Sequence, residues 1–214
     1  MAADVARYGP DIQTEAELKL CGNVEGKRVL ELGTGAQAAI AFAKQGAHTV
    51  AVDTSAERLA ALRARADEEE VKVELHESDL ADLAFVRADS IDLAFSCYAF
   101  DAVDDLNRVF RQVHRVLRQD MPLVFSVAHP AYAMIDDQSE EPLLVRRSYF
   151  DRSSESGSRR TISELFTGLT RANFRVDTIL EPEPASGGPR SAEWRDTFKY
   201  VPRTLIIRAR KEGL

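Results

Sequence analysis

The sequence predicts an α/β protein with a doubly wound sheet, in which strands alternate along the chain with the helices that cover them. From residue 28 onward, short apolar runs rich in β-branched residues alternate with longer segments of helical period. Several of the runs are almost continuously apolar, which is typical of strands that are buried on both faces. We expect strands at 28–32, 48–52, 71–75, 91–96 and 122–127.

The clearest predicted helix covers about 103–117. Its apolar residues recur at spacings of three and four and form one stripe that would pack on the sheet: Val103, Leu106, Val109, Phe110, Val113, Val116 and Leu117. Thr54 with Glu57 predicts a capping box at the start of the helix after the second strand. Thr161 with Glu164 predicts a second capping box, at the start of a late helix.

The regular alternation stops after the fifth strand. Residues 131–160 have few apolar repeats, and we interpret them as an inserted lid or loop. Asn173 would end the late helix, and two further strands follow at 174–180 and 204–210, with no helical pattern between them. We expect these strands to form an antiparallel pair. The sequence thus predicts one domain over 1–214, made of an N-terminal helical segment (1–27), a cofactor-binding core (28–130), the lid insertion (131–160), and a final helix and strand pair (161–214).

Composition excludes several classes of function. The formal net charge of −7 in 214 residues would repel a polyanion, so we expect no nucleic-acid partner. No apolar run has the length of a membrane span and the first residues lack a secretory signal, so we expect a cytoplasmic protein with no membrane partner. Cys21 and Cys97 are too few for a disulfide framework or a cysteine-built zinc site, and we predict no metal. Nothing in the sequence indicates the oligomeric state.

The strongest local signal is VLELGTGAQAA at 29–39, where a strand turns through Gly33 and Gly35 into a helix. Glycines allow a backbone to approach a ligand closely. Asp53, at the end of the second strand, lies where a carboxylate can accept hydrogen bonds from both ribose hydroxyls of a nucleotide. A purely structural turn would also use glycine, but Asp53 at this distance favours an adenosine-type cofactor.

Two cofactors fit such a turn. GTGAQA matches G-x-G-x-x-A, which would indicate a nicotinamide-dependent oxidoreductase. Three observations favour a methyltransferase: Glu31 lies two residues before Gly33, no Tyr is followed four residues later by Lys, and the final strand pair suits a different sheet. A protein that binds the cofactor without catalysis is the third alternative.

The sequence resembles class I S-adenosylmethionine-dependent methyltransferases, in the broad group that modifies small molecules and includes ubiquinone-type methyltransferases. ELGTG resembles the first motif of the family, VAVDTS the second, residues 78–130 the later core, and residues 160–184 the helix and strand after the lid. The resemblance implies a Rossmann-like sheet of seven strands with an antiparallel last strand. It also implies methyl transfer from S-adenosylmethionine to a small-molecule acceptor.

By position, the resemblance assigns residues of the first two strand ends to the cofactor. Glu31, Gly33 and Gly35 would lie against its methionine end. Asp53 would hold the ribose, and Thr54 would pack beside the adenine. Replacing Asp53 with Ala should therefore weaken cofactor binding while moving the thermal midpoint little.

Further assignments follow later in the core. Asp79 would accept a hydrogen bond from the adenine amino group, and Leu80 would contribute its backbone. Ser96 and Cys97 would meet the cofactor where the fourth strand ends, and Tyr98 would border the methyl group. Asp79 as a solvated turn residue and Tyr98 as core packing are the alternatives.

Gln37 departs from the family pattern, because it stands where a third glycine is usual; alternatively, the loop is one residue short after Ala36, and QAAIAFA resumes the family helix. We expect it to bring bulk or altered geometry to the turn and to affect cofactor affinity. His129, at the end of the fifth strand, is the candidate general base if the acceptor loses a proton, although it could instead cap the strand. Five arginines surround the predicted lid: Arg146, Arg147, Arg152, Arg159 and Arg160. They would attract an acidic acceptor, or alternatively most of them are solvated surface residues.

Overall fold

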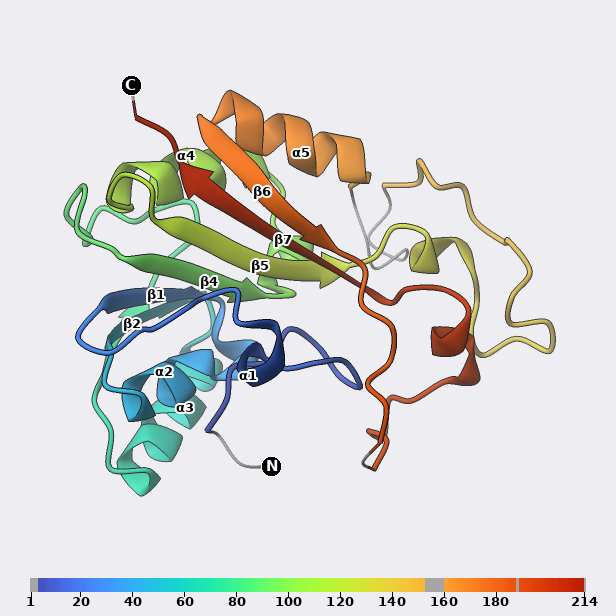
Figure 1. The fold of residues 1–214 in the computed structure, drawn as a ribbon, viewed down its shortest axis with the longest axis horizontal. Helices are drawn as coiled ribbons and strands as arrows, with labels where there is room; N and C mark the ends of the chain where they lie inside the picture. The colour runs from blue at the N-terminus through green and yellow to red at the C-terminus, as the bar shows by residue number, and fades with distance from the viewer. Residues whose placement is uncertain (1–3, 153–159, 188, 214) are drawn as a thin grey trace.

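The computed structural model describes residues 4–152, 160–187 and 189–213. Within them the chain forms one seven-stranded sheet of order β3-β2-β1-β4-β5-β7-β6 (Figure 1). The strands are β1 (Arg28–Leu32), β2 (His48–Asp53), β3 (Val73–Glu77), β4 (Leu93–Cys97), β5 (Pro122–Ala128), β6 (Phe174–Leu180) and β7 (Thr204–Lys211). β1 to β5 are parallel, whereas β7 runs antiparallel to both of its neighbours. The predicted sheet and its antiparallel last strand are confirmed.

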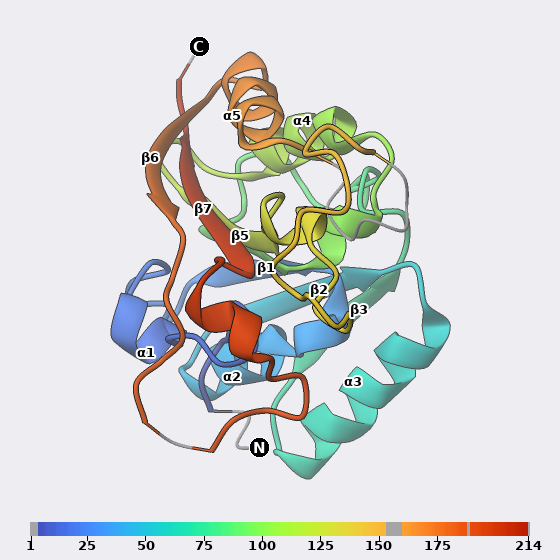
Figure 2. The same ribbon diagram turned by 90° about the vertical axis from the view of Figure 1, so that its right-hand side faces the viewer.

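Helices cover both faces of the sheet (Figures 1 and 2). α1 (Glu15–Leu18), α2 (Ala38–Lys44) and α3 (Ala56–Glu68) lie on one side, and α4 (Leu106–Val116) and α5 (Ile162–Arg171) on the other. The predicted apolar stripe packs on the sheet, since all its members from Leu106 onward are buried. Val103 precedes the helix, because Asp105 caps α4 by accepting a hydrogen bond from the backbone N–H of Arg108.

Several element ends differ from the prediction by one or two residues. Ser55, not Thr54, caps α3, because its hydroxyl accepts the N–H of Arg58. β3 begins at Val73, since the N–H of Val71 still donates to the carbonyl of Ala66 at the end of α3.

The two predictions for the ends of α5 are confirmed. The predicted capping box of Thr161 and Glu164 is present at the start of α5. Asn173 has φ 62° directly after the α5 cap, as predicted.

Two segments lie outside this regular pattern. The N-terminal segment is helical only over Glu15–Leu18, and turns carry the remainder of its described residues. Residues 131–152 contain a 3-10 helix at Tyr132–Met134 and one bridge between Ile135 and Val145. The rest of the predicted insertion lies mostly in 153–159, outside the described residues. No helix in the described part of the chain is long and apolar enough to cross a membrane.

Candidate functional site

The turn after β1 requires glycine at position 33 and leaves open space beside position 35. Gly33 has φ +80°, and a Cβ there would lie 2.1 Å from the Cβ of Ala99. The turn and the 3-10 helix Ala99–Ala102 after β4 therefore pack too closely for any side chain. A Cβ on Gly35 would meet nothing within 4 Å. The backbone at Gly35 thus borders open space.

That space is a cavity of about 550 Å³ at the carboxyl ends of β1, β2 and β4, which we call the glycine-turn cavity. A crevice at this edge is where open α/β sheets bind ligands. Eight of the predicted site residues line it: Gly33, Gly35, Asp53, Thr54, Asp79, Leu80, Cys97 and Tyr98. The structure thus brings together residues from four separate parts of the sequence.

Asp53 is almost completely buried at the floor of this cavity, with 1% of its surface exposed. One oxygen accepts hydrogen bonds from the N–H and the hydroxyl of Thr34, at 2.7 and 2.9 Å. The other accepts from the N–H of Ser55 at 2.9 Å and from Nη2 of Arg58 at 2.7 Å. Burial alone would raise the pKa of this carboxyl, but the hydrogen bonds from Arg58, Thr34 and Ser55 lower it to about 2. Asp53 is therefore a fixed negative charge.

Glu31 and Ser96 lie behind the cavity instead of lining it. The Glu31 carboxylate accepts the N–H groups of Ala38 and Ala39 at 2.8 and 2.9 Å, which caps the start of α2. Burial raises the pKa of this carboxyl to about 7, although the two backbone hydrogen bonds oppose the shift. The Ser96 hydroxyl donates to the carbonyl of Leu32 and ties β4 to the end of β1. Both residues position the turn.

Gln37 keeps the backbone conformation that a glycine would adopt. Its φ of 52° and ψ of 35° are left-handed, and it precedes the first residue of α2. It does not line the glycine-turn cavity. The expected bulk therefore stays out of the cavity, and the cost of Gln37 is the backbone strain of a non-glycine residue at positive φ.

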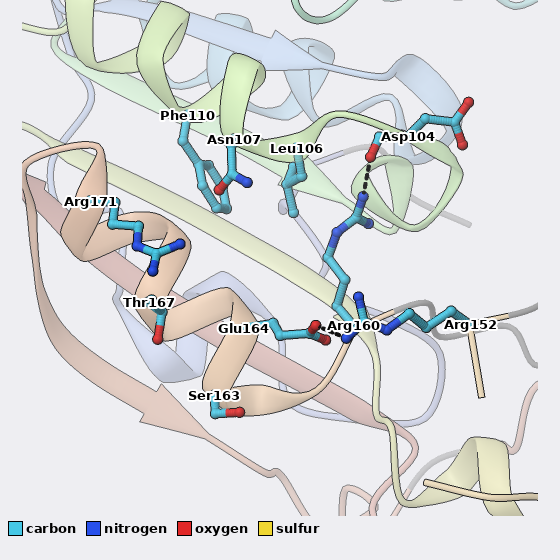
Figure 3. Close-up of a pocket in the computed structure, with 10 residues that line it drawn as sticks. All are labelled: Asp104, Leu106, Asn107, Phe110, Arg152, Arg160, Ser163, Glu164, Thr167 and Arg171. Atoms are coloured by element: carbon cyan, nitrogen blue, oxygen red, sulfur yellow. Dashed lines mark hydrogen bonds and ion pairs between the residues drawn. The ribbon is translucent and has the colours of Figure 1, made fainter. Parts of the chain in front are cut away.

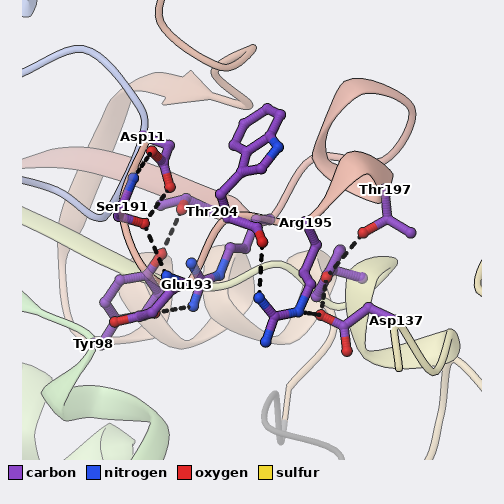
Figure 4. A network of polar contacts seen from close by, with 11 residues as sticks. Asp11, Tyr98, Asp137, Ser191, Glu193, Arg195, Thr197 and Thr204 are labelled. Carbon is purple, nitrogen blue, oxygen red and sulfur yellow. Dashed lines mark hydrogen bonds and ion pairs between the residues drawn. The ribbon is translucent and has the colours of Figure 1, made fainter. Parts of the chain in front are cut away.

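Tyr98 separates the glycine-turn cavity from a second cavity of about 510 Å³, and no other described residue lines both. We call the second one the Arg203 cavity; its walls come from the end of β5, residues 132–138 and the segment before β7. The Tyr98 hydroxyl is hydrogen-bonded to that of Thr204 (Figure 4). Burial raises the pKa of Tyr98 to about 12, so the phenol is neutral at pH 7. Tyr98 is positioned as a wall between two sites.

His129 lines the Arg203 cavity, but both of its ring nitrogens are engaged. Nδ1 accepts the N–H of Ala131 at 3.1 Å, and Nε2 lies 2.7 Å from Oε1 of Glu181. Because a backbone N–H uses the lone pair of Nδ1, the hydrogen-bond network assigns the ring proton to Nε2, which donates to Glu181. This arrangement leaves no free lone pair to take a proton from an acceptor.

Asp101 is a titratable group that the sequence analysis missed. It lies in the 3-10 helix after β4, and its Oδ2 accepts the N–H of Ala128 at 2.8 Å. Burial raises the pKa of its carboxyl to about 7, against the opposing effects of that hydrogen bond and of the Arg160 charge. Ala102, next to it, lines the glycine-turn cavity, and Ala128 lines the Arg203 cavity. Asp101 itself lines neither cavity and lies behind these two neighbours.

The predicted lid arginines have separate environments. Arg147 lines the Arg203 cavity, whereas Arg152 and Arg160 border a third cavity between α4 and α5 (Figure 3). Arg160 donates to the carbonyls of Phe100 and Asp104, and Arg152 is paired with Glu164. Arg146 is exposed and lies 3.8 Å from Glu141, and Arg159 lies outside the described residues. Of the four described arginines in this set, Arg147 alone lines the same cavity as Tyr98.

Comparisons with known proteins agree with this geometry. A family model described as "Methyltransferase domain" matches residues 30–125, from β1 to β5. A solved S-adenosylmethionine-dependent methyltransferase from Mesorhizobium loti is 26% identical, with a TM-score of 0.73 over 92% of this chain and 96% of that one. A second, from Aquifex aeolicus, is 18% identical and shares the fold, with a TM-score of 0.62 over 91% and 87% of the two chains.

Among curated relatives, an uncharacterised protein of Haemophilus influenzae is 23% identical over 94% of this chain and 87% of its own length. The matched domain covers the strands whose ends form the glycine-turn cavity. These matches support an S-adenosylmethionine-dependent methyltransferase, with a methyltransferase domain over residues 30–125 and S-adenosylmethionine as its cofactor.

Proposed function

We propose that the enzyme methylates a small organic molecule, with S-adenosylmethionine in the glycine-turn cavity and the acceptor in the Arg203 cavity. The observation that carries this proposal is that Tyr98 alone, among the described residues, lines both cavities. Direct transfer requires the methyl group and the acceptor nucleophile to meet in line at the edge of Tyr98, where the two cavities adjoin. Each cavity has a volume in the range of ordinary small-molecule sites.

The residues present fit the cofactor. The open space above Gly35 admits a ligand against the backbone, and the Asp53 carboxylate at the floor is suited to ribose hydroxyls. Asp79 is exposed at the cavity rim, with its Oδ1 accepting the N–H of Ala81 and its Oδ2 available to the adenine amino group beside Leu80. The bound cofactor supplies a methyl group already activated by its sulfonium.

The enzyme's own contribution is therefore mainly orientation. If the acceptor also loses a proton, Asp101 is the alternative to His129, because burial raises the pKa of its carboxyl to about 7. This role requires the carboxyl to turn from the N–H of Ala128 toward the acceptor, since Asp101 lines neither cavity. His129 is the residue predicted from sequence, and its engagement with Ala131 and Glu181 makes it a positioning residue in this proposal.

Residues 131–152, the described part of the predicted insertion, act as a lid in this proposal. They supply Tyr132, Ile135 and Arg147 to the Arg203 cavity, while Val145 and Phe150 are 59% and 75% exposed. Closure over an acceptor would bury that apolar surface. Hydrogen exchange with and without S-adenosylhomocysteine and an acceptor analogue tests the lid, since equal protection of this segment in both states contradicts it.

Transfer of labelled methyl from S-adenosylmethionine tests the function as a whole. The enzyme is incubated with a fractionated cell extract, and label is followed into the small-molecule, protein and nucleic-acid fractions. We expect label in small molecules, and less of it with an Asp53→Asn variant. Label confined to protein or nucleic acid would contradict the small-molecule acceptor, and tight binding of NADH instead of S-adenosylhomocysteine would contradict the cofactor assignment.

A further inference from the structure

Arg203, just before β7, has a buried donor that no described residue satisfies. Its Nη2 donates to Oε2 of Glu193 at 2.5 Å, and its guanidinium carbon lies 4.8 Å from the ring centre of Phe198. Its Nη1 is buried without a hydrogen-bond partner among the described residues. A buried charged donor without an acceptor is destabilising, so we expect a bound water or ligand to satisfy it where the described residues do not.

The acids around this cavity are already engaged elsewhere. Asp137 accepts the Tyr132 hydroxyl at 2.6 Å and lies 4.0 Å from Arg195. Asp136 accepts the N–H of Gln138, within its own turn. Figure 4 shows this network: Arg195 points to Asp137, while Asp11 holds Ser191 on the same loop. None of these carboxylates is hydrogen-bonded to Nη1 of Arg203.

One wall of the Arg203 cavity is suited to an apolar or aromatic body, beside the polar side chains of Asp136, Asp137 and Glu193. Two tyrosine rings, Tyr98 and Tyr132, share the wall with Ala128, Ala133 and Ile135. Arg147 adds a second guanidinium to the same cavity, where its Nη1 donates weakly to the carbonyl of Ile135 at 3.4 Å. Guanidinium groups pair with carboxylates through two parallel hydrogen bonds, and a ring carrying a carboxylate would satisfy both features of the cavity.

We propose that Arg203 binds a carboxylate of the methyl acceptor, so that the substrate is a small aromatic carboxylic acid; this rests on the proposed function of the Arg203 cavity. The acid enters with its ring against Tyr98 and Tyr132 and its carboxylate on Nη1 of Arg203. Glu193 holds the other end of the guanidinium and fixes its direction. Arg203 is thus a specificity-determining residue for the acceptor.

The test compares acids with their neutral amides. Benzoate, 4-hydroxybenzoate and phenylacetate, and the amide of each, are titrated calorimetrically into the enzyme saturated with S-adenosylhomocysteine. We expect at least one acid to bind tenfold or more tightly than its amide. Arg203→Gln should remove that difference, Arg203→Lys should restore part of it, and Arg190→Gln, on the same loop but stacked on Trp194, should leave it unchanged.

The outcomes separate this inference from the proposed function. Failure of S-adenosylhomocysteine to bind contradicts the cofactor site and is seen before any acid is added. Normal binding of S-adenosylhomocysteine, with no acid preferred over its amide, overturns the carboxylate inference alone. If Arg203→Gln does not fold, the acid and amide comparison on the parent enzyme and on Arg203→Lys still decides the question.

Discussion

Arg58 holds the Asp53 carboxylate with two nitrogens, Nε at 3.0 Å from Oδ2 and Nη2 at 2.7 Å from Oδ1. The carboxylate that should hold the ribose is therefore covered by a side chain of the same cavity. The Arg58 side chain is 55% exposed, whereas that of Asp53 is 2% exposed. Leaving a buried carboxylate without its partner is costly, but the exposed guanidinium can move into solvent where the ribose hydroxyls take over its hydrogen bonds to Asp53. We infer that the ribose binds by replacing Arg58.

Removing this competitor should tighten cofactor binding. We expect Arg58→Gln to lower the dissociation constant of S-adenosylhomocysteine by about two- to tenfold, which corresponds to about 0.4–1.4 kcal/mol. Arg63→Gln, an exposed arginine on the same helix, is the matched control and should change nothing. Calorimetric titration measures both. Weaker binding in Arg58→Gln would show instead that the guanidinium contacts the cofactor.

Asp53→Ala should weaken S-adenosylhomocysteine binding by about one to three orders of magnitude, because charge-assisted hydrogen bonds to the ribose are lost. The sequence-based expectation that the thermal midpoint would move little is revised by the structure. Asp53 is buried and accepts the N–H and hydroxyl of Thr34, so its removal leaves buried donors unsatisfied at about 1–3 kcal/mol. We expect a lower midpoint by calorimetry as well, with exposed Asp67→Ala as the control.

Fold and site were predictable to different extents. β1 and β6 have the predicted bounds, because their apolar patterns end at turn residues. The paired predictions at Gly33 and Asp53 came from spacing alone, and both residues line one cavity. Local sequence suffices where one element and its turn determine the position.

The missed residues depend on contacts between distant segments. Arg203 reaches the end of β5 only because β7 inserts antiparallel between β5 and β6. His129 looks like a free base in sequence, but Ala131 and Glu181, the latter 52 residues later in the chain, engage its two ring nitrogens. Arg58 had a usable signal, since an arginine in the first turn of a helix can fold back on the acid at the preceding strand end.

Asp101 should make stability depend on pH in a predictable direction. Its folded pKa is about 7, raised from 3.8, so the folded protein keeps a proton that the unfolded chain releases. The contribution of Asp101 to the free energy of unfolding therefore falls as pH rises from about 3.8 to about 7, and it then stays constant. Asp101→Asn can still accept the N–H of Ala128 and has no charge to bury. Urea unfolding should show the variant gaining stability over the parent at pH 8 relative to pH 4. An equal difference at both pH values would contradict the raised pKa.

The same added methyl group should affect stability at Gly33 and cofactor binding at Gly35. In Gly33→Ala the new Cβ would lie 2.1 Å from that of Ala99 on a backbone with φ +80°, so we expect a loss of about 2–5 kcal/mol from overpacking and strain. In Gly35→Ala the Cβ meets no protein atom within 4 Å, so the free energy of unfolding should stay within about 0.5 kcal/mol of the parent. That methyl group points into space that the cofactor needs, and we expect the dissociation constant of S-adenosylhomocysteine to rise at least tenfold. Denaturant unfolding and calorimetric titration on both variants separate the effects. If Gly35→Ala binds the ligand as the parent does, the backbone of this turn does not approach the cofactor, even though the fold around Gly33 is as described.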